Sequence, residues 1–209
     1  MPVDFRVYLI TDRTQAPGGD ILAAVAAALD GGIRAVQLRE KDLGGRELFR
    51  LAEAMRRLTA RYRARLLVND RLDVAYAAGA DGVHLGVGSI PAGDARKLLG
   101  PRALVGRSAH GAAELAAAEA EGADFATFGP VYATPSKARY GPPVGVAALA
   151  AACASAKIPV FAIGGVGPGN MHETLKAGAF GIALISAVVA AADPRAAALE
   201  LTARFAPGR

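Results

Sequence analysis

The residues that could carry chemistry follow short apolar stretches of the chain, at the points where strands would end. Gln37, Arg39 and Lys41 stand at alternating positions after one such stretch, so their side chains share one side of an extended backbone. A further lysine, Lys137, follows a later apolar stretch. Cations gathered at one point repel one another unless an anion neutralises them. The sequence therefore predicts an anionic ligand that contacts Arg39, Lys41 and Lys137.

Other strand ends carry groups suited to metal binding, hydrogen bonding or proton transfer. Asn69 and Asp70 follow one apolar stretch, where they would either bind a ligand or cap the next helix. His84 lies within a stretch, and we expect it to be a hydrogen-bonded interior histidine. His110 follows a strand end in a more open position, and imidazole titrates near neutral pH. His110 is therefore the candidate for acid–base chemistry.

Glycines and hydroxyl groups indicate a phosphate site. Gly164-Gly165 and Gly167-Pro-Gly-Asn170 precede an expected helix, and glycine leaves backbone N–H groups free to approach a phosphate. Ser186, at the end of the last apolar stretch, could complete this cradle. The remaining hydroxyls near strand ends are those of Ser108, Thr134 and Ser136.

A repeated pattern predicts the elements that position these residues. In each repeat a glycine suited to end a helix is followed about three residues later by a short apolar strand. The repeats are Gly31–Leu38, Ala78–Leu85, Glu121–Phe128 and Ala177–Leu184. Further apolar runs alternate with them, at Val7–Thr11, Leu66–Asn69, Leu104–Ser108 and Val160–Gly164. The pattern therefore predicts eight strands.

Helical stretches alternate with the expected strands. They are Asp20–Leu29, Glu47–Tyr62, Leu72–Ala78, Ala92–Leu99, Ala112–Glu121, Val146–Ala154, Met171–Ala177 and Arg195–Phe205. Eight strand–helix units in so short a chain predict a single compact (β/α)8 TIM barrel spanning residues 1–209. An open doubly wound sheet is disfavoured, because no phosphate-loop or dinucleotide fingerprint follows the first strand. The longest irregular segment, Gly129–Gly145, is a candidate active-site loop.

Composition excludes several classes of protein. The 209 residues are 53% hydrophobic, which excludes a disordered chain. The single cysteine, Cys153, excludes an intrachain disulfide and a cysteine-based zinc site. The chain shows no membrane-spanning run and no signal-peptide pattern, so we expect a cytoplasmic protein. The net charge of +5 comes from mostly scattered arginines, so we expect no nucleic-acid partner.

A set of motifs resembles those of thiamine phosphate synthases and the related thiazole tautomerases. The resemblance runs from Tyr8 to Ala190, in order, through every expected strand. The motifs are Tyr8-Leu-Ile-Thr-Asp12, Val36-Gln-Leu-Arg-Glu-Lys41, Leu67-Val-Asn-Asp70, Gly82-Val-His-Leu-Gly86, Phe128-Gly-Pro130, Thr134-Pro-Ser-Lys137, Ala162-Ile-Gly-Gly165 and Leu184-Ile-Ser-Ala187.

The resemblance implies a synthase that couples hydroxymethylpyrimidine diphosphate with hydroxyethylthiazole phosphate, or its carboxylated form, and releases pyrophosphate. It also implies a role for each matching residue. Gln37 would contact the pyrimidine, and Asp70 would bind Mg²⁺. Ser108 would lie near the migrating methylene as a catalytic residue, together with Lys137. The implied diphosphate ligands are Arg39, Lys41, Asn69 and Lys137, and the implied thiazole phosphate ligands are Thr134, Ser136, Gly165 and Ser186.

The chain departs from the synthase pattern in one loop. The synthases have Gly-Gln-Glu-Asp, whose aspartate is a second Mg²⁺ ligand, whereas this chain has Gly86-Val-Gly-Ser89. Ser89 would then be a weaker metal ligand beside Asp70. A milder change places Ser136 where a threonine is usual.

A second activity and a non-enzymatic function remain open. Gly106-Arg-Ser-Ala-His110 resembles the tautomerases, in which the matching histidine moves a proton on thiazole carboxylate phosphate without metal. A sensor could instead bind such phosphates without turnover. For each of these functions we expect small phosphorylated pyrimidines and thiazoles as ligands, and no membrane partner. The sequence leaves open whether the chain forms a homo-oligomer.

Overall fold

The computed structural model describes residues 3–134 and 142–205. Short, almost wholly buried runs form the strands, as expected for a parallel sheet covered by helices. The strands are β1 (Val7–Ile10), β2 (Ala35–Leu38), β3 (Arg65–Asn69), β4 (Gly82–Leu85), β5 (Leu104–Ala109), β6 (Phe125–Phe128), β7 (Val160–Ile163) and β8 (Gly181–Leu184). They follow one another in chain order around a closed barrel. The predicted (β/α)8 barrel is therefore confirmed, and an open doubly wound sheet is excluded.

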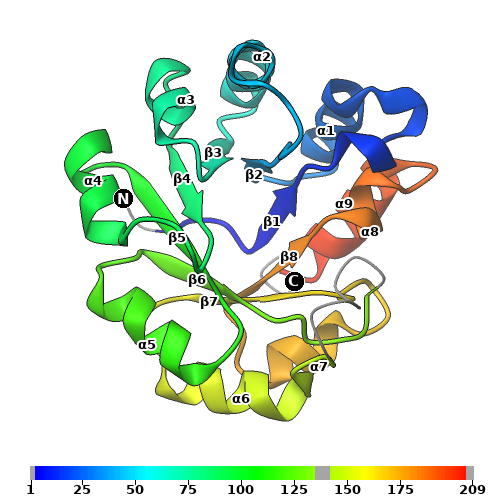
Figure 1. Cartoon of the computed structure of the whole chain (residues 1–209). Coiled ribbons are helices and arrows are strands. Elements are labelled where there is room, and N and C mark those ends of the chain that lie inside the picture. Colours follow the sequence, from blue (N-terminus) through cyan, green and yellow to red (C-terminus); the bar gives the residue numbers. More distant parts are fainter. Residues whose placement is uncertain (1–2, 135–141, 206–209) are drawn as a thin grey trace. The chain divides into compact units, whose positions relative to one another are not determined.

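The helices alternate with the strands at nearly the predicted positions (Figure 1). They are α1 (Ile21–Asp30), α2 (Gly45–Arg61), α3 (Leu72–Ala77), α4 (Ala92–Leu99), α5 (Ala112–Ala120), α6 (Gly145–Ser155), α7 (Met171–Lys176), α8 (Ser186–Val189) and α9 (Pro194–Ala203). Among the described helices, none combines the length and the hydropathy that a membrane span requires. The glycines predicted to end helices, at 32, 79, 122 and 178, all adopt positive φ.

The chain comprises two compact units, and one of them is Phe5–Val83 with Leu184–Arg209. Within it, β2 pairs in parallel with both β1 and β3, with Val36 opposite Leu9 on one side and Leu66 on the other. Helices α1, α2 and α3 lie beside these strands (Figure 1). The backbone of α9 passes so close to α1 that a Cβ on Gly31 would lie 2.5 Å from the carbonyl oxygen of Arg195. Glycine at this position therefore allows α9 to pack.

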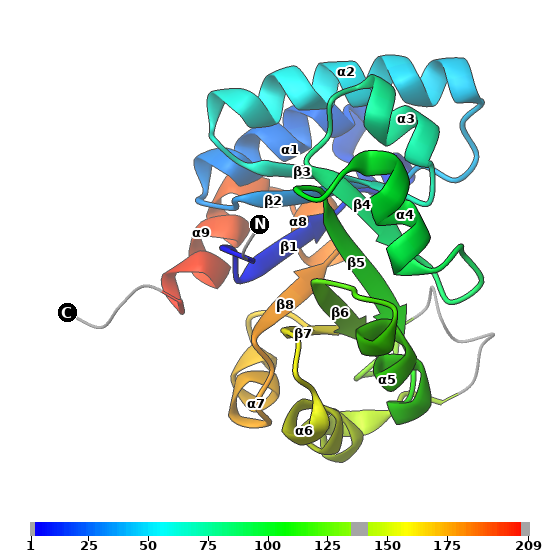
Figure 2. The same cartoon turned by 90° about the vertical axis from the view of Figure 1, so that its left-hand side faces the viewer.

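The other unit is Met1–Asp4 with His84–Ala183. Within it, β6 pairs in parallel with β5 and β7, and β7 pairs with β8. Helices α5, α6 and α7 lie beside β6 and β7 (Figure 2). The Phe125 and Phe161 rings meet edge to face with centroids 5.4 Å apart, and Phe161 meets Phe180 in the same way at 5.6 Å. These aromatic contacts fix the strands whose ends carry the candidate residues.

Three short helical turns were not expected from the sequence. They are the 3₁₀ turns η1 (Arg13–Gln15) and η2 (Pro17–Gly19) and the helix α8. Each is too short for an apolar repeat to reveal it. A local side chain stabilises η1, because the Asp12 carboxylate accepts a hydrogen bond from the Thr14 backbone N–H at 3.2 Å.

Candidate active site

Gln37 lies at the end of β2 with its side chain buried. It is 1% exposed, and its Nε2 donates a hydrogen bond to the Tyr8 hydroxyl at 3.1 Å. Burial raises the pKa of the Tyr8 phenol, and the hydrogen bond from Gln37 only partly offsets this. Tyr8 therefore stays protonated, and it holds the Gln37 amide in one orientation.

The two cations after β2 stand on an anchored backbone. The Arg39 N–H donates to the hydroxyl of the buried Thr11 at 2.9 Å, and the Thr11 N–H donates to the Gln37 carbonyl oxygen at 2.9 Å. The Arg39 side chain is half-buried and Lys41 is exposed. No ion pair joins Lys41 to a residue within 3–134 or 142–205. The charge of Lys41 is thus available to an anionic ligand.

Asn69 and Asp70 end β3 but do not cap the following helix. Arg71 is the N-cap residue of α3 and no side-chain capping hydrogen bond forms there, so the capping alternative is wrong. Instead, the Asn69 Nδ2 donates to the Asp70 carboxylate at 3.0 Å. Asp70 has a φ of 58°, in the left-handed region that costs a non-glycine residue about 1 kcal/mol. A strained, hydrogen-bonded carboxylate at a strand end is a common feature of functional sites.

Ser186 belongs to the same unit as Asp70 and the β2 cations. The structure places it at the first residue of α8, two positions beyond the end of β8, with an exposed side chain. The sequence had placed it at the strand end itself.

Ser108, near the end of β5, is held by a buried histidine, and both residues belong to the unit that contains His84–Ala183. His84 is 3% exposed, and its Nε2 lies 3.1 Å from the Ser108 hydroxyl and 3.4 Å from that of Thr127. A Cβ on Gly106 would lie 2.6 Å from the His84 Nδ1, so glycine makes room for the imidazole. The prediction of a hydrogen-bonded interior histidine is confirmed.

His110 follows β5 and is paired with a carboxylate. Its side chain is 45% exposed, and its Nδ1 lies 3.0 Å from the Glu114 carboxylate, which also accepts its backbone N–H at 2.6 Å. A carboxylate at Nδ1 orients the ring. The pair is therefore suited to proton transfer at Nε2.

The glycine-rich loop after β7 is partly closed by its own asparagine. The Asn170 Nδ2 donates to the Gly165 carbonyl oxygen at 2.9 Å, and the Gly167 N–H donates to the Asn170 Oδ1 at 2.8 Å. The expectation that the Gly167 N–H is free for a phosphate is therefore wrong. Gly165 has a φ of 65°, and a Cβ there would lie 2.7 Å from that of Tyr132, so the tight turn at Gly165 requires glycine.

Tyr132 joins the segment after β6 to α7. Its hydroxyl donates to the Glu173 carboxylate at 2.9 Å. Partial burial, followed by this carboxylate, raises the pKa of Tyr132 to about 12. Thr134, half-buried, is the last described residue of this segment. Ser136 and Lys137 lie outside the described residues, as does much of the predicted loop Gly129–Gly145.

Arg107, a buried arginine to which the sequence assigned no role, holds the loop that carries Ser89. Arg107 is 7% exposed, and its Nη1 donates to the carbonyl oxygens of Gly86 at 2.9 Å and Ile90 at 3.4 Å. Its Nη2 lies 3.2 Å from the Glu121 carboxylate. The guanidinium therefore joins both ends of the loop after β4 to a partly buried ion pair. Such partners are distant in sequence, so no local motif indicates them.

We expect Arg107→Lys to lower the free energy of unfolding by about 1–2 kcal/mol, because lysine keeps the charge but loses the forked contacts. The loss is limited because the Arg107 Nε has no hydrogen-bond partner among the described residues. Urea unfolding measures the change, and Arg102→Lys, at an exposed position before β5, is the control. Equal stability of the two variants would show that Arg107 does not hold the loop.

The described residues contain no group of three or more His, Cys, Asp or Glu side chains that could hold a metal ion. Magnesium, however, is often bound by one or two carboxylates together with substrate phosphates. Asp70 can serve as such a carboxylate. The Asp70 carboxylate therefore fits a magnesium ion whose other ligands come from a phosphorylated substrate.

The chain is similar to known proteins both in sequence and in fold. A family model described as thiamine monophosphate synthase matches residues 7–188. A protein of Geobacter sulfurreducens is 61% identical over 205 residues, which cover 98% of this chain and 96% of the relative. A thiamine-phosphate synthase of Moorella thermoacetica is 46% identical over 195 residues, 93% of each chain. A thiamine phosphate pyrophosphorylase structure from Pyrococcus furiosus is 40% identical with a TM-score of 0.86, covering 95% of this chain and 94% of the other. The chain therefore belongs to the thiamine monophosphate synthase family.

Proposed function

We propose that this chain is a thiamine-phosphate synthase. In the reaction, the bond between the pyrimidine methylene carbon and the diphosphate oxygen breaks, and its electron pair leaves with pyrophosphate. The thiazole nitrogen then forms the new bond to the methylene carbon. The observation that carries the proposal is the anchored segment after β2, which presents Arg39 and Lys41. The family match, which covers residues 7–188, supports the same function.

In this proposal the charged residues stabilise the leaving group. Pyrophosphate gains negative charge as the C–O bond breaks, and fixed cations lower the energy of that charge without reorganising. Arg39 and Lys41 would supply this charge together with Lys137, and the Asn69 amide would donate a hydrogen bond. Gln37, fixed by Tyr8, would bind the pyrimidine ring.

The remaining residues would hold the second substrate and the reacting carbon. Ser108, fixed by His84, would lie near the methylene and stabilise its positive charge through the hydroxyl oxygen. The proposed ligands of the thiazole phosphate are Thr134, Ser136, Gly165 and Ser186. The Gly165 turn, closed by Asn170, would bring its backbone close to the phosphate.

A magnesium ion would enter with the diphosphate. Asp70 is the carboxylate that fits it, and Ser89 offers a hydroxyl as a weaker ligand. When bound, the ion supplies positive charge to the leaving pyrophosphate. Asn69 donates to the Asp70 carboxylate and so holds it in one orientation.

The thiazole tautomerase is the second candidate, and the His110–Glu114 pair is the observation that favours it. A histidine oriented by a carboxylate can take a proton from one ring carbon and return it to another. The synthase is the better supported function because relatives that match more than nine-tenths of this chain are named thiamine-phosphate synthases.

One experiment separates these functions. Purified protein is given both synthase substrates, with and without Mg²⁺, and thiamine phosphate and pyrophosphate are measured. A parallel sample contains thiazole carboxylate phosphate in deuterated water. We expect Mg²⁺-dependent condensation, and a modest loss of that activity in His110→Ala. Absent condensation, with deuterium exchange that falls roughly 10²–10⁴-fold in His110→Ala, would establish the tautomerase instead. Ligand binding with neither reaction would indicate a sensor.

A further inference from the structure

Acidic and basic residues alternate directly after β2. The order is Arg39, Glu40, Lys41, Asp42, and the last two residues lie in a turn in which the Leu43 N–H donates to the Glu40 carbonyl oxygen at 3.4 Å. Left to themselves, carboxylates so close to the cations would neutralise them. The molecule must therefore hold Glu40 and Asp42 elsewhere if Arg39 and Lys41 are to bind an anion.

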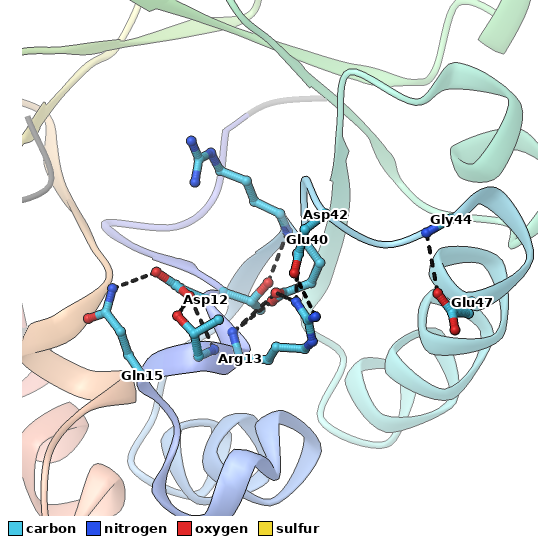
Figure 3. A network of polar contacts seen from close by, with 10 residues as sticks. Asp12, Arg13, Gln15, Glu40, Asp42, Gly44 and Glu47 are labelled. Atoms are coloured by element: carbon cyan, nitrogen blue, oxygen red, sulfur yellow. Dashed lines mark hydrogen bonds and ion pairs between the residues drawn. The ribbon is translucent and has the colours of Figure 1, made fainter. Parts of the chain in front are cut away.

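One arginine from the neighbouring segment holds both carboxylates. The Arg13 backbone N–H lies 3.1 Å from each oxygen of Glu40, and its Nη1 lies 3.3 Å from the Glu40 Oε2. The same guanidinium contacts Asp42 with both terminal nitrogens, at 2.6 and 2.7 Å. Figure 3 shows Arg13, which follows β1, joined by dashed lines to the side chains of Glu40 and Asp42.

The two carboxylates differ in how much they need this partner. The Glu40 side chain is 2% exposed, whereas that of Asp42 is 62% exposed. A buried carboxylate without a partner is costly, and nearby cations would be drawn to it. Hydrogen bonds from Arg13 also hold the pKa of Asp42 below its usual range. Arg13 is therefore the cation that balances the two carboxylates.

Arg13 is itself fixed by the turn in which it lies. It begins η1, and the Asp12 carboxylate accepts hydrogen bonds from the Thr14 hydroxyl at 2.6 Å and from the Gln15 amide at 2.6 Å (Figure 3). The turn therefore presents the Arg13 backbone N–H to Glu40 in a defined direction. The turn η1 belongs to the same unit as Arg39 and Lys41. It follows the carboxyl end of β1, as Arg39 and Lys41 follow that of the neighbouring parallel strand β2.

We propose that Arg13 is a positioning residue for diphosphate binding, which holds Glu40 and Asp42 away from Arg39 and Lys41 and leaves those two cations for the anion. The inference rests on the proposed synthase function. It requires no contact between Arg13 and the substrate. Its effect is confined to the diphosphate, and binding of the thiazole phosphate does not depend on it.

The test compares Arg13→Gln with the wild type. Calorimetry measures the binding of inorganic pyrophosphate, and steady-state kinetics measures the KM of each substrate. We expect pyrophosphate affinity to fall about tenfold, the equivalent of one charge-assisted contact. The KM of the diphosphate substrate should rise similarly, with little change for the thiazole phosphate. The double variant Arg13→Gln with Glu40→Gln should recover part of the affinity, because the buried carboxylate that competes for the cations is gone. Loss of structure alone predicts no such recovery.

The matched control is Arg56→Gln. Arg56 forms a partly buried ion pair with Asp81 in the same unit, at the opposite ends of the strands. We expect this variant to lose stability but to keep pyrophosphate affinity. If Arg13→Gln does not fold, Arg13→Lys decides the question, because lysine keeps one charge but not the fork, and its affinity should fall about threefold.

Two results would overturn the inference in different ways. Unchanged pyrophosphate affinity in the folded Arg13 variants of an active enzyme would refute the positioning role alone. A wild-type protein that neither condenses the substrates nor binds pyrophosphate would refute the proposed function, and the inference with it.

Discussion

Asp70→Asn is expected to lower the rate of condensation by about 10²-fold or more, because a bound divalent ion contributes several kcal/mol of charge stabilisation to the leaving group. The substitution is chosen for the backbone. Asp70 has a φ of 58°, and asparagine tolerates this left-handed conformation about as well as aspartate does. The variant therefore removes the charge and keeps the turn. Thermal unfolding should show a stability close to that of the wild type.

The control for Asp70→Asn is Asp73→Asn, on α3. Asp73 is an exposed carboxylate that pairs with Arg71, so its loss changes the same net charge away from the proposed site. Mg²⁺ titration of the rate is the measurement. In the wild type background, Ser89→Asp restores the carboxylate of the synthase pattern, and it should lower the Mg²⁺ concentration needed for half-maximal rate. If Asp70→Asn and Asp73→Asn require the same Mg²⁺ concentration and turn over equally fast, Asp70 is not the metal ligand.

The barrel could be predicted from local signals in the sequence. Gly32 and Gly122 adopt the left-handed conformation that ends a helix, and buried strands follow each of them. This conformation is a property of single residues, and the spacing of such glycines gives the number of strand–helix units. Asp20 likewise caps α1, with its carboxylate accepting the Ala23 N–H at 3.0 Å. Turns as short as η1 and α8 carry no such signal.

Contacts between distant residues could not be predicted from the sequence. Glu40 lies 27 residues from Arg13, so nothing in the local pattern shows that its charge is balanced. The same is true of Arg107, whose partners come from the loop after β4 and from Glu121. The capping alternative for Asn69 and Asp70 failed for a different reason. The helix begins at Leu72, as predicted, but the positive φ of Asp70 turns the chain before it and makes Arg71 the N-cap residue.

Arg39→Ala should weaken pyrophosphate binding by about 10–150-fold, which corresponds to about 1.5–3 kcal/mol for a hydrogen bond to a charged group. The structure separates this effect from stability. Thr11 holds the backbone N–H of Arg39, and that contact survives the loss of the side chain. The guanidinium makes no hydrogen bond to any described residue, although its charge contributes to the low pKa of Asp12. We therefore expect the free energy of unfolding to change by no more than about 0.5 kcal/mol.

Salt dependence tests whether the Arg39 contact is electrostatic. The affinity of the wild type for pyrophosphate should fall as ionic strength rises, and the slope should be smaller in Arg39→Ala because one cation is missing. Arg39→Lys keeps the charge but not the fork, so it should restore the salt slope and only part of the affinity. Arg50→Ala, which removes an exposed charge from α2, is the control for net charge. If Arg50→Ala and Arg39→Ala lose the same affinity, the field of the whole protein, and not a contact with Arg39, attracts the diphosphate.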